Sequence, residues 1–119
     1  MKICVTSRGP DLSSEVDPRF GRARYFIIRD EETDTYEAVD NQQNVNAGGG
    51  AGVQSATTIA EKGCQWVISG HMGPKALSVL KEAGIRVATG ASGKVSDALV
   101  AFREGKLQEI DAADVSSHW

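Results

Sequence analysis

His71 offers the widest choice of chemistry in this chain. It stands in Gly70-His71-Met72-Gly73, between an apolar segment and Pro74, a residue suited to the first turn of a helix. A neutral imidazole on such a turn can ligate a metal or carry a proton. No second histidine stands at ligand spacing, so a loop histidine facing water is the alternative interpretation, and His118 belongs to the C-terminal tail.

Cys4 and Cys64 are the two cysteines, and their spacing fits neither a CxxC motif nor a four-thiolate cluster site. Cys4 lies in an apolar stretch and is expected to behave as a small buried hydrophobic residue. Cys64 follows Gly63 and is expected to be partly exposed. Lys62 is the one cation near it in sequence, so we do not predict a catalytic thiol. The cysteine usage favours a reduced, cytoplasmic protein.

Positive charge and free backbone N–H groups suggest a second chemistry, the binding of an anion. Arg19 and Arg22 flank Phe20-Gly21, and two guanidinium groups can clamp an anionic group. Downstream, Gly48-Gly49-Gly50-Ala51-Gly52 opens a helical pattern and offers the positive end of a helix dipole. The cluster lacks the Walker and GxGxxG patterns, so a nucleotide interpretation is weak. An ordinary tight loop with solvated arginines is the alternative.

The periodic segments around these residues predict an α/β domain with a five-stranded mixed sheet flanked by helices. A hairpin supplies two antiparallel strands, and a crossover helix joins two parallel strands. Val53, Ala56, Thr57 and Ala60 are expected to form the apolar stripe of the first helix. Strands are expected at 3–5, 25–30, 35–40, 65–69 and 85–88, helices at 53–62, 74–83 and 94–104, a short edge segment at 106–110 and a frayed tail at 111–119.

Three helical patterns end at a glycine, which is the residue of a left-handed C-terminal cap; these are Gly63, Gly84 and Gly105. The carboxyl ends of parallel strands meet at one edge of a sheet. We therefore expect the loops after the first strand, after Ser69 and after Ala88 to gather there, with the glycine cluster converging on them. This convergence is the main structural reason to expect a site.

Composition restricts the class of partner. The chain has 119 residues, a net charge of −3 and a pI near 5.3, which argue against a nucleic-acid backbone as partner. No apolar run approaches the ~20 residues of a membrane helix. Residues 1–110 are read as a single domain without repeat or linker.

Taken in order, several motifs resemble the dinitrogenase iron-molybdenum cofactor biosynthesis family, the small domain shared by the NifX, NafY and NifB C-terminal proteins. The resemblance covers roughly residues 1 to 110. The motifs that carry it are Arg19-Phe20-Gly21-Arg22-Ala23, Asn44 with Gly48 to Gly52, Gly70-His71-Met72-Gly73-Pro74-Lys75-Ala76, Gly84-Ile85-Arg86-Val87 and Gly105-Lys106-Leu107.

The resemblance implies a ribonuclease-H-like fold and the binding of an iron–molybdenum or iron–sulfur cluster on its way to an apo-metalloprotein. In cofactor-carrying relatives a histidine commonly occupies the first position of the FGRA-type motif, where this chain has Arg19, which cannot ligate a metal. His71 is a hypothetical substitute ligand. The implied cofactor-binding residues are Arg19, Phe20, Gly21, Arg22, Asn44, Gly48, Gly49, Gly50, Gly52, Gly70 and Gly73.

The leading hypothesis is a non-catalytic carrier of a metal–sulfur cluster. The alternative is a module for a small anion, a nucleotide or a protein partner that keeps the fold and binds no cluster. A hydrolase with His71 as base is a weaker idea, because no nucleophile or metal site accompanies it. A nuclease is disfavoured because Ile3-Cys4-Val5 provides no acid in the first strand. The physiological ligand and its recipient stay open.

Overall fold

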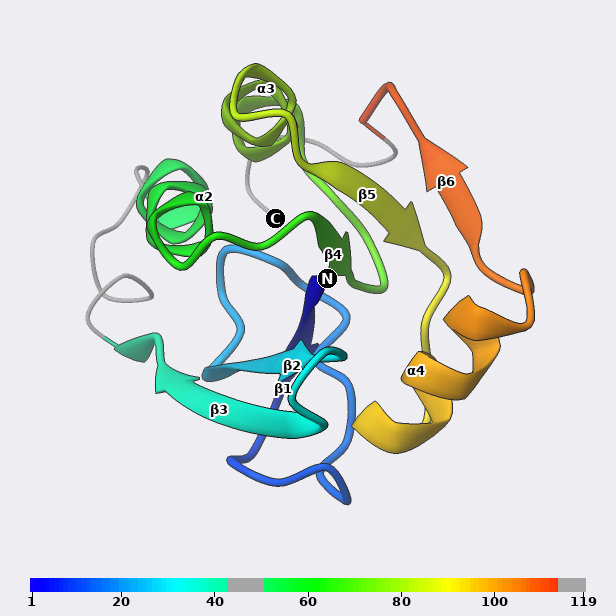
Figure 1. The fold of residues 1–119 in the computed structure, drawn as a ribbon. Helices are drawn as coiled ribbons and strands as arrows, with labels where there is room; N and C mark the ends of the chain where they lie inside the picture. The colour runs from blue at the N-terminus through cyan, green and yellow to red at the C-terminus, as the bar shows by residue number, and fades with distance from the viewer. Residues whose placement is uncertain (43–50, 114–119) are drawn as a thin grey trace.

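The fold is known from a computed structural model that describes residues 1–42 and 51–113 (Figure 1). Asn44, Gly48, Gly49, Gly50 and His118 therefore lie outside the described residues. The elements are β1 (Lys2–Ser7), β2 (Tyr25–Asp30), β3 (Thr35–Asp40), α2 (Ala51–Glu61), β4 (Trp66–Ile68), α3 (Pro74–Glu82), β5 (Arg86–Thr89), α4 (Val95–Arg103) and β6 (Gln108–Ile110).

The described strands form one mixed sheet of six strands in the order β3-β2-β1-β4-β5-β6. β2 and β3 form the predicted antiparallel hairpin, and β4 and β5 are parallel as predicted. β1 lies in the middle, antiparallel to β2 and parallel to β4. The sheet has one strand more than the five predicted, because the expected edge segment at 106–110 contains Gln108–Ile110, which pairs with β5 as a sixth strand. Three residues are too few for an alternating pattern to identify this segment as a strand.

Helices cover both faces of the sheet, with α2 and α3 on one face and α4 on the other (Figure 1). Successive side chains of β1 point to opposite faces of the sheet, so the strand contributes to both core layers. Cys4 packs under α2 and α3, whereas Ile3 and Val5 pack under α4. The loop after β1 adds Val16 to the α4 layer and Phe20 to the other. This loop is therefore part of the core.

The buried face of α2 differs from the predicted stripe. The helix buries Ala51, Ser55, Ala56 and Ile59, so Ala56 is the one predicted position that is fully buried. Thr57 is exposed, and its hydroxyl donates to the carbonyl of Val53 at 3.0 Å. The predicted stripe is rotated from the buried face, because it followed the spacing from Val53 and so left out Ile59 and the hydrogen-bonded Ser55.

The other helices follow their sequence patterns. α3 buries Ala76, Leu77 and Leu80, and α4 buries Val95, Ala98 and Leu99 with Phe102 partly buried beside them. Ala83, which lies at helical spacing from Leu80 and would extend this apolar stripe, is instead exposed at the C-terminal cap of α3. All three capping glycines have the expected left-handed backbone, with φ of 77°, 75° and 71° at Gly63, Gly84 and Gly105.

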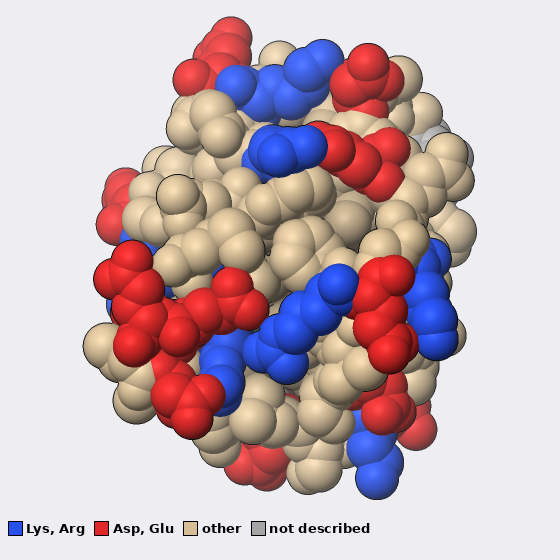
Figure 2. All heavy atoms as spheres, turned by 45° about the vertical axis from the view of Figure 1, so that its right-hand side comes forward, with Lys and Arg blue, Asp and Glu red and all other residues tan. Residues whose placement is uncertain are grey.

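Acidic and basic side chains are interspersed on the face of the molecule drawn in Figure 2. Ion pairs join Arg86 to Glu109 between β5 and β6, Arg103 to Glu31 between α4 and the β2–β3 turn, and Lys106 to Glu104 after α4. In the described ranges, no helix is long and apolar enough to span a membrane.

Candidate anion-binding site

The loop between β1 and β2 crosses the carboxyl ends of the parallel strands. Val16 bridges to Ser7, and the Asp17 N–H donates to the Thr6 carbonyl at 3.1 Å. The loop after β4 meets the loop after β5, where the Gly90 N–H donates to the Gly70 carbonyl at 3.1 Å. The predicted gathering of the three loops at this edge is confirmed.

Arg19 and His71, the two side chains singled out from the sequence, are neighbours at this edge. They pair in a parallel bridge, and the His71 N–H donates to the carbonyl of Pro18 at 2.8 Å. A parallel bridge directs the two paired side chains to the same side. Arg19 is 49% exposed, whereas His71 is half-buried and so less accessible than expected.

Glycines make the close approach of these loops possible. A methyl group at Gly70 would lie 2.7 Å from Pro18 Cα, which is far inside van der Waals contact. A methyl group at Gly21 would lie 2.8 Å from both N and Cα of Gly52 in the first turn of α2. Gly52 in turn faces Ala76 in the first turn of α3, because a methyl group on it would lie 3.3 Å from the Ala76 Cβ. The FGRA-type motif thus lies against the N-terminus of α2, which in turn packs against the first turn of α3.

These two helix N-termini differ from that of α4 in their charge. Neither α2 nor α3 has an acidic residue in its first turn, and no side chain caps α3 at Gly73. On the other face of the sheet, α4 has Asp97 accepting the Lys94 N–H at 3.3 Å. The positive ends of the α2 and α3 dipoles therefore have no neutralising carboxylate on their first turns.

Phe20 lies beneath this surface and has no exposed area. Its ring packs against that of Phe26 with centroids 5.4 Å apart. Gly21, Gly70 and Gly73 are buried as well, whereas Arg22 is half-buried. The glycines and Phe20 shape the loops, while Arg19, Arg22 and His71 are the side chains with exposed area among the described residues that the sequence put forward for binding.

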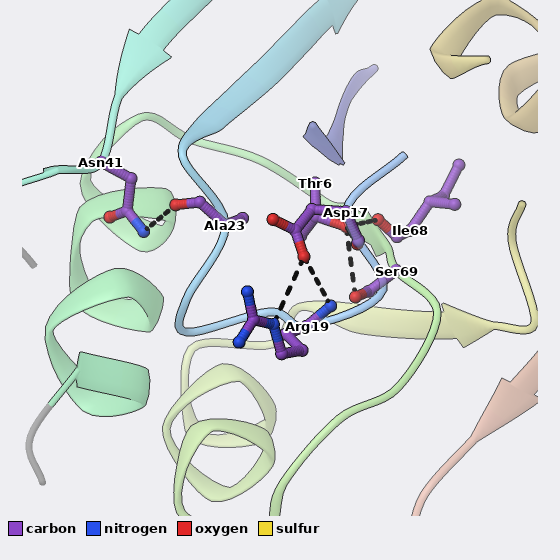
Figure 3. A network of polar contacts seen from close by, with 7 residues as sticks. All are labelled: Thr6, Asp17, Arg19, Ala23, Asn41, Ile68 and Ser69. Carbon is purple, nitrogen blue, oxygen red and sulfur yellow. Dashed lines mark hydrogen bonds and ion pairs between the residues drawn. The ribbon is translucent and has the colours of Figure 1, made fainter. Parts of the chain in front are cut away.

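Two buried polar groups hold the loops in place, and the sequence analysis assigned neither a role (Figure 3). Asn41 donates through Nδ2 to the Ala23 carbonyl at 2.8 Å and accepts from Ser55 Oγ at 3.2 Å. Ser55 Oγ also lies 3.4 Å from the Gly21 carbonyl oxygen. Asn41, which is 1% exposed, and the fully buried Ser55 thus form a polar bracket that connects the motif loop to α2 and to the end of β3.

The second polar group centres on Asp17 (Figure 3). Its carboxylate accepts the Arg19 N–H at 3.0 Å, and its carbonyl accepts the Thr6 hydroxyl at 2.7 Å. The Ser69 hydroxyl lies 3.2 Å from that of Thr6. The Asp-Pro dipeptide, which favours turn initiation, is the sequence signal that could have identified Asp17; Asn41 and Ser55 have no comparable signal.

The sequence matches the dinitrogenase iron-molybdenum cofactor family over residues 1–105. The chain belongs to this family. It is also 32% identical over 113 residues to the protein MJ0580 of Methanocaldococcus jannaschii, a match that covers 93% of this chain and 92% of that protein.

Solved structures support this membership in the dinitrogenase cofactor family. The apo form of the orange protein from Desulfovibrio gigas superposes with a TM-score of 0.92 and 36% identity, over 96% of each chain. A putative NifB protein from Thermotoga superposes with a TM-score of 0.85 and 36% identity, over 96% of this chain and 97% of that one. A putative dinitrogenase from Methanocaldococcus jannaschii, at 14% identity and a TM-score of 0.70 over 94% and 96%, shares the fold alone.

The cysteines of this family member do not fit direct ligation of a cluster. Cys4 has no exposed area and Cys64 is 5% exposed, so the expected partial exposure of Cys64 is wrong. Burial raises the pKa of the Cys64 thiol to about 11 and that of Cys4 well above its usual range. Thiolates are the form that binds metal. Within the described ranges, no three His, Cys, Asp or Glu side chains are grouped as metal ligands.

Proposed function

We propose that this chain binds and carries an anionic metal–sulfur cluster, an iron–molybdenum cofactor or an iron–sulfur precursor, without catalysing a reaction on it. The observation that carries the proposal is the pairing of Arg19 with His71 beside the N-termini of α2 and α3. Membership in the dinitrogenase cofactor family supports a metal–sulfur cargo.

The chemistry of these groups suits an anion more than a bare metal ion. Guanidinium groups and helix N-termini stabilise negative charge and donate hydrogen bonds, but neither can ligate a metal. The buried thiols leave His71 as the one candidate for a direct bond to the cluster among the motif side chains with exposed area. We therefore propose that the cargo is held mainly by charge and hydrogen bonds, which permits its release to a recipient.

Anaerobic incubation with a cluster tests the proposal. The purified protein is mixed with iron–molybdenum cofactor or with a [4Fe–4S] donor, desalted, and followed by visible absorption, EPR and metal analysis. We expect stoichiometric uptake, weakened about tenfold or more in Arg19→Ala, since a charge-assisted hydrogen bond contributes about 1.5–3 kcal/mol. Weaker uptake in His71→Ala would assign the imidazole a part in binding.

Arg103→Ala is the matched control for Arg19→Ala. Arg103 is 47% exposed and its Nε lies 3.3 Å from Glu31, so it resembles Arg19 in exposure and pairing. It stands on α4, on the other face of the sheet, and its loss is expected to leave uptake unchanged. Equal losses in the two variants would point to non-specific attraction and against a site.

A module for a small anion, a nucleotide or a protein partner, binding no cluster, is the competing function. The burial of both cysteines favours it, because common clusters are held by thiolates. Absence of any uptake by the wild-type protein would select this alternative. A cytoplasmic location, which the cysteine usage favours, belongs to the carrier proposal, as do an apo-metalloprotein recipient and a ribonuclease-H-like classification of the sheet, which the resemblance implies.

A further inference from the structure

Asp17 is a buried carboxylate at the centre of a site that we propose to bind anions. Its side chain is 8% exposed, although it lies next to the half-exposed Arg19. Its backbone is fixed from both sides, because its N–H donates to the Thr6 carbonyl at 3.1 Å and its carbonyl accepts the Thr6 hydroxyl at 2.7 Å. Pro18 follows and restricts the chain further. The Asp17 backbone is therefore held on both sides, and its side chain is buried.

Both contacts of the Asp17 side chain go to Arg19. Oδ1 accepts the Arg19 N–H at 3.0 Å, and the Arg19 Nε lies 3.8 Å from the same oxygen. In Figure 3 the dashed lines from the carboxylate run to the Arg19 N–H and to Nε, and none runs to a terminal nitrogen of the guanidinium. No other acceptor in residues 1–42 and 51–113 is paired with these nitrogens. The ion pair therefore engages the guanidinium at its Nε side, at a distance longer than a hydrogen bond, and no described residue is hydrogen-bonded to the terminal nitrogens.

A carboxylate in an anion site repels the ligand, so its presence calls for a compensating role. A free arginine side chain has many rotamers, and ordering it on binding lowers affinity. A carboxylate that already holds the Nε edge reduces this loss. The planar fork then presents two donors in a fixed geometry, which matches a ligand with two neighbouring acceptor atoms.

We propose that Asp17 is a positioning residue of the anion site, holding Arg19 by its N–H and Nε so that both terminal NH2 groups face one bound anion. The inference rests on the proposed function and specifies the selectivity of the anion site. The site prefers anions that offer two adjacent sulfur or oxygen acceptors over monatomic anions. Arg19, which stands where cofactor-carrying relatives commonly have a histidine, then donates two hydrogen bonds to one anion.

Asp17→Asn separates positioning from charge. Asparagine keeps the shape and an oxygen that accepts the Arg19 N–H, but it loses the charge that attracts Nε. Dissociation constants are measured by equilibrium dialysis for tetrathiomolybdate, which presents adjacent sulfur atoms, and for bromide, which is monatomic. We expect Asp17→Asn to weaken tetrathiomolybdate binding about tenfold while bromide binding stays equal or becomes tighter. Tighter binding of both anions would mean that Asp17 acts only through its charge, and would overturn the inference.

Arg19→Lys provides an independent test, because lysine has no Nε edge for Asp17 to hold. This variant is expected to lose the preference for tetrathiomolybdate, and adding Asp17→Asn to it is expected to have little further effect. Two independent, additive losses would contradict a shared action of the pair.

A measurement without ligand keeps the inference distinct from the proposed function. The heteronuclear NOE of the Arg19 Nε–H reports picosecond-to-nanosecond motion of the side chain. We expect a restrained Nε–H in the wild type and a more mobile one in Asp17→Asn, with thermal unfolding as the folding control. Equal mobility in both proteins would overturn the positioning role. Failure of the wild type to bind either anion would refute the proposed function, while the NOE would still decide whether Asp17 holds Arg19.

Discussion

Arg19 and His71 lie side by side in a parallel bridge, joined by the hydrogen bond from the His71 N–H to the carbonyl of Pro18 at 2.8 Å. One residue follows β1 and the other follows β4, the two parallel strands in the middle of the sheet. Their pairing brings a permanent cation and an imidazole together next to the start of α3. The account of function depends on this pair and on the groups that hold it.

Gly21→Ala tests the contact between the motif loop and α2. The added methyl group would lie 2.8 Å from the backbone of Gly52, so the loop or the helix must move. We expect a loss of about 1–3 kcal/mol in the free energy of unfolding, measured with urea, together with weaker cluster uptake. Gly63→Ala is the control: its φ of 77° disfavours alanine, but nothing lies within 4 Å of the added methyl. It is expected to lose stability and keep uptake; normal uptake in Gly21→Ala would argue against the loop–helix contact as part of the site.

Asn41→Ala removes the centre of the buried bracket. The change leaves the Ala23 carbonyl and Ser55 without the partner seen here, and a buried polar group left without its hydrogen bond costs about 1–3 kcal/mol. We expect a loss of that size or somewhat more in chemical denaturation. Gln42→Ala, at an exposed neighbouring position, is expected to change stability by less than about 0.5 kcal/mol. Similar small effects for both variants would show that the bracket is dispensable.

Phe20→Ala tests whether the motif phenylalanine serves the core or the ligand. Because the ring is fully buried against Phe26, its removal is expected to lower the free energy of unfolding by about 3–5 kcal/mol. Phe20→Leu keeps most of the volume and is expected to lose less stability and to retain uptake. A Phe20→Leu protein that is stable but binds no cluster would instead indicate direct contact of the ring with the ligand.

The buried thiols predict weak reactivity and a loss of stability at high pH. Burial raises the pKa of Cys64 from its ordinary 9.0 to about 11, so the native state retains a proton that the unfolded chain releases. Stability from this group is complete below pH 9 and declines as the pH rises from about 9 towards 11. Cys64→Ala is expected to flatten this decline in denaturation experiments across that range. Rapid alkylation of the native thiols at pH 8 would contradict their burial.

Much of the architecture was predictable because local sequence patterns indicate the strands and the helix ends. The hairpin strands follow from the apolar run Tyr25–Asp30 and the return Thr35–Asp40, and the helix ends follow from Gly63, Gly84 and Gly105. The site edge followed from a general property of parallel strands, whose carboxyl ends meet. These signals need no knowledge of distant contacts.

The remaining features depend on contacts between distant segments. Ser55 turns inward because Asn41 and the Gly21 carbonyl are there, which no helical pattern reveals. β6 forms because β5 offers an open edge, so its three residues need no strong strand signal of their own. Cys64 is buried by its neighbours in the α2 and α3 layer, although it follows a helix-capping glycine at the surface.

The salt dependence of cluster binding tests the central claim most directly. A cluster held by Arg19, Arg22 and helix N-termini is bound largely by charge, and such binding weakens as salt screens it. Unbound cluster is removed by anaerobic gel filtration in buffers of increasing sodium chloride concentration. The bound metal per chain is then measured at each concentration. We predict that occupancy falls as salt rises, and that Arg19→Ala binds more weakly at every concentration and has a shallower salt dependence. Occupancy that ignores salt but is abolished in Cys4→Ala or Cys64→Ala would contradict the account.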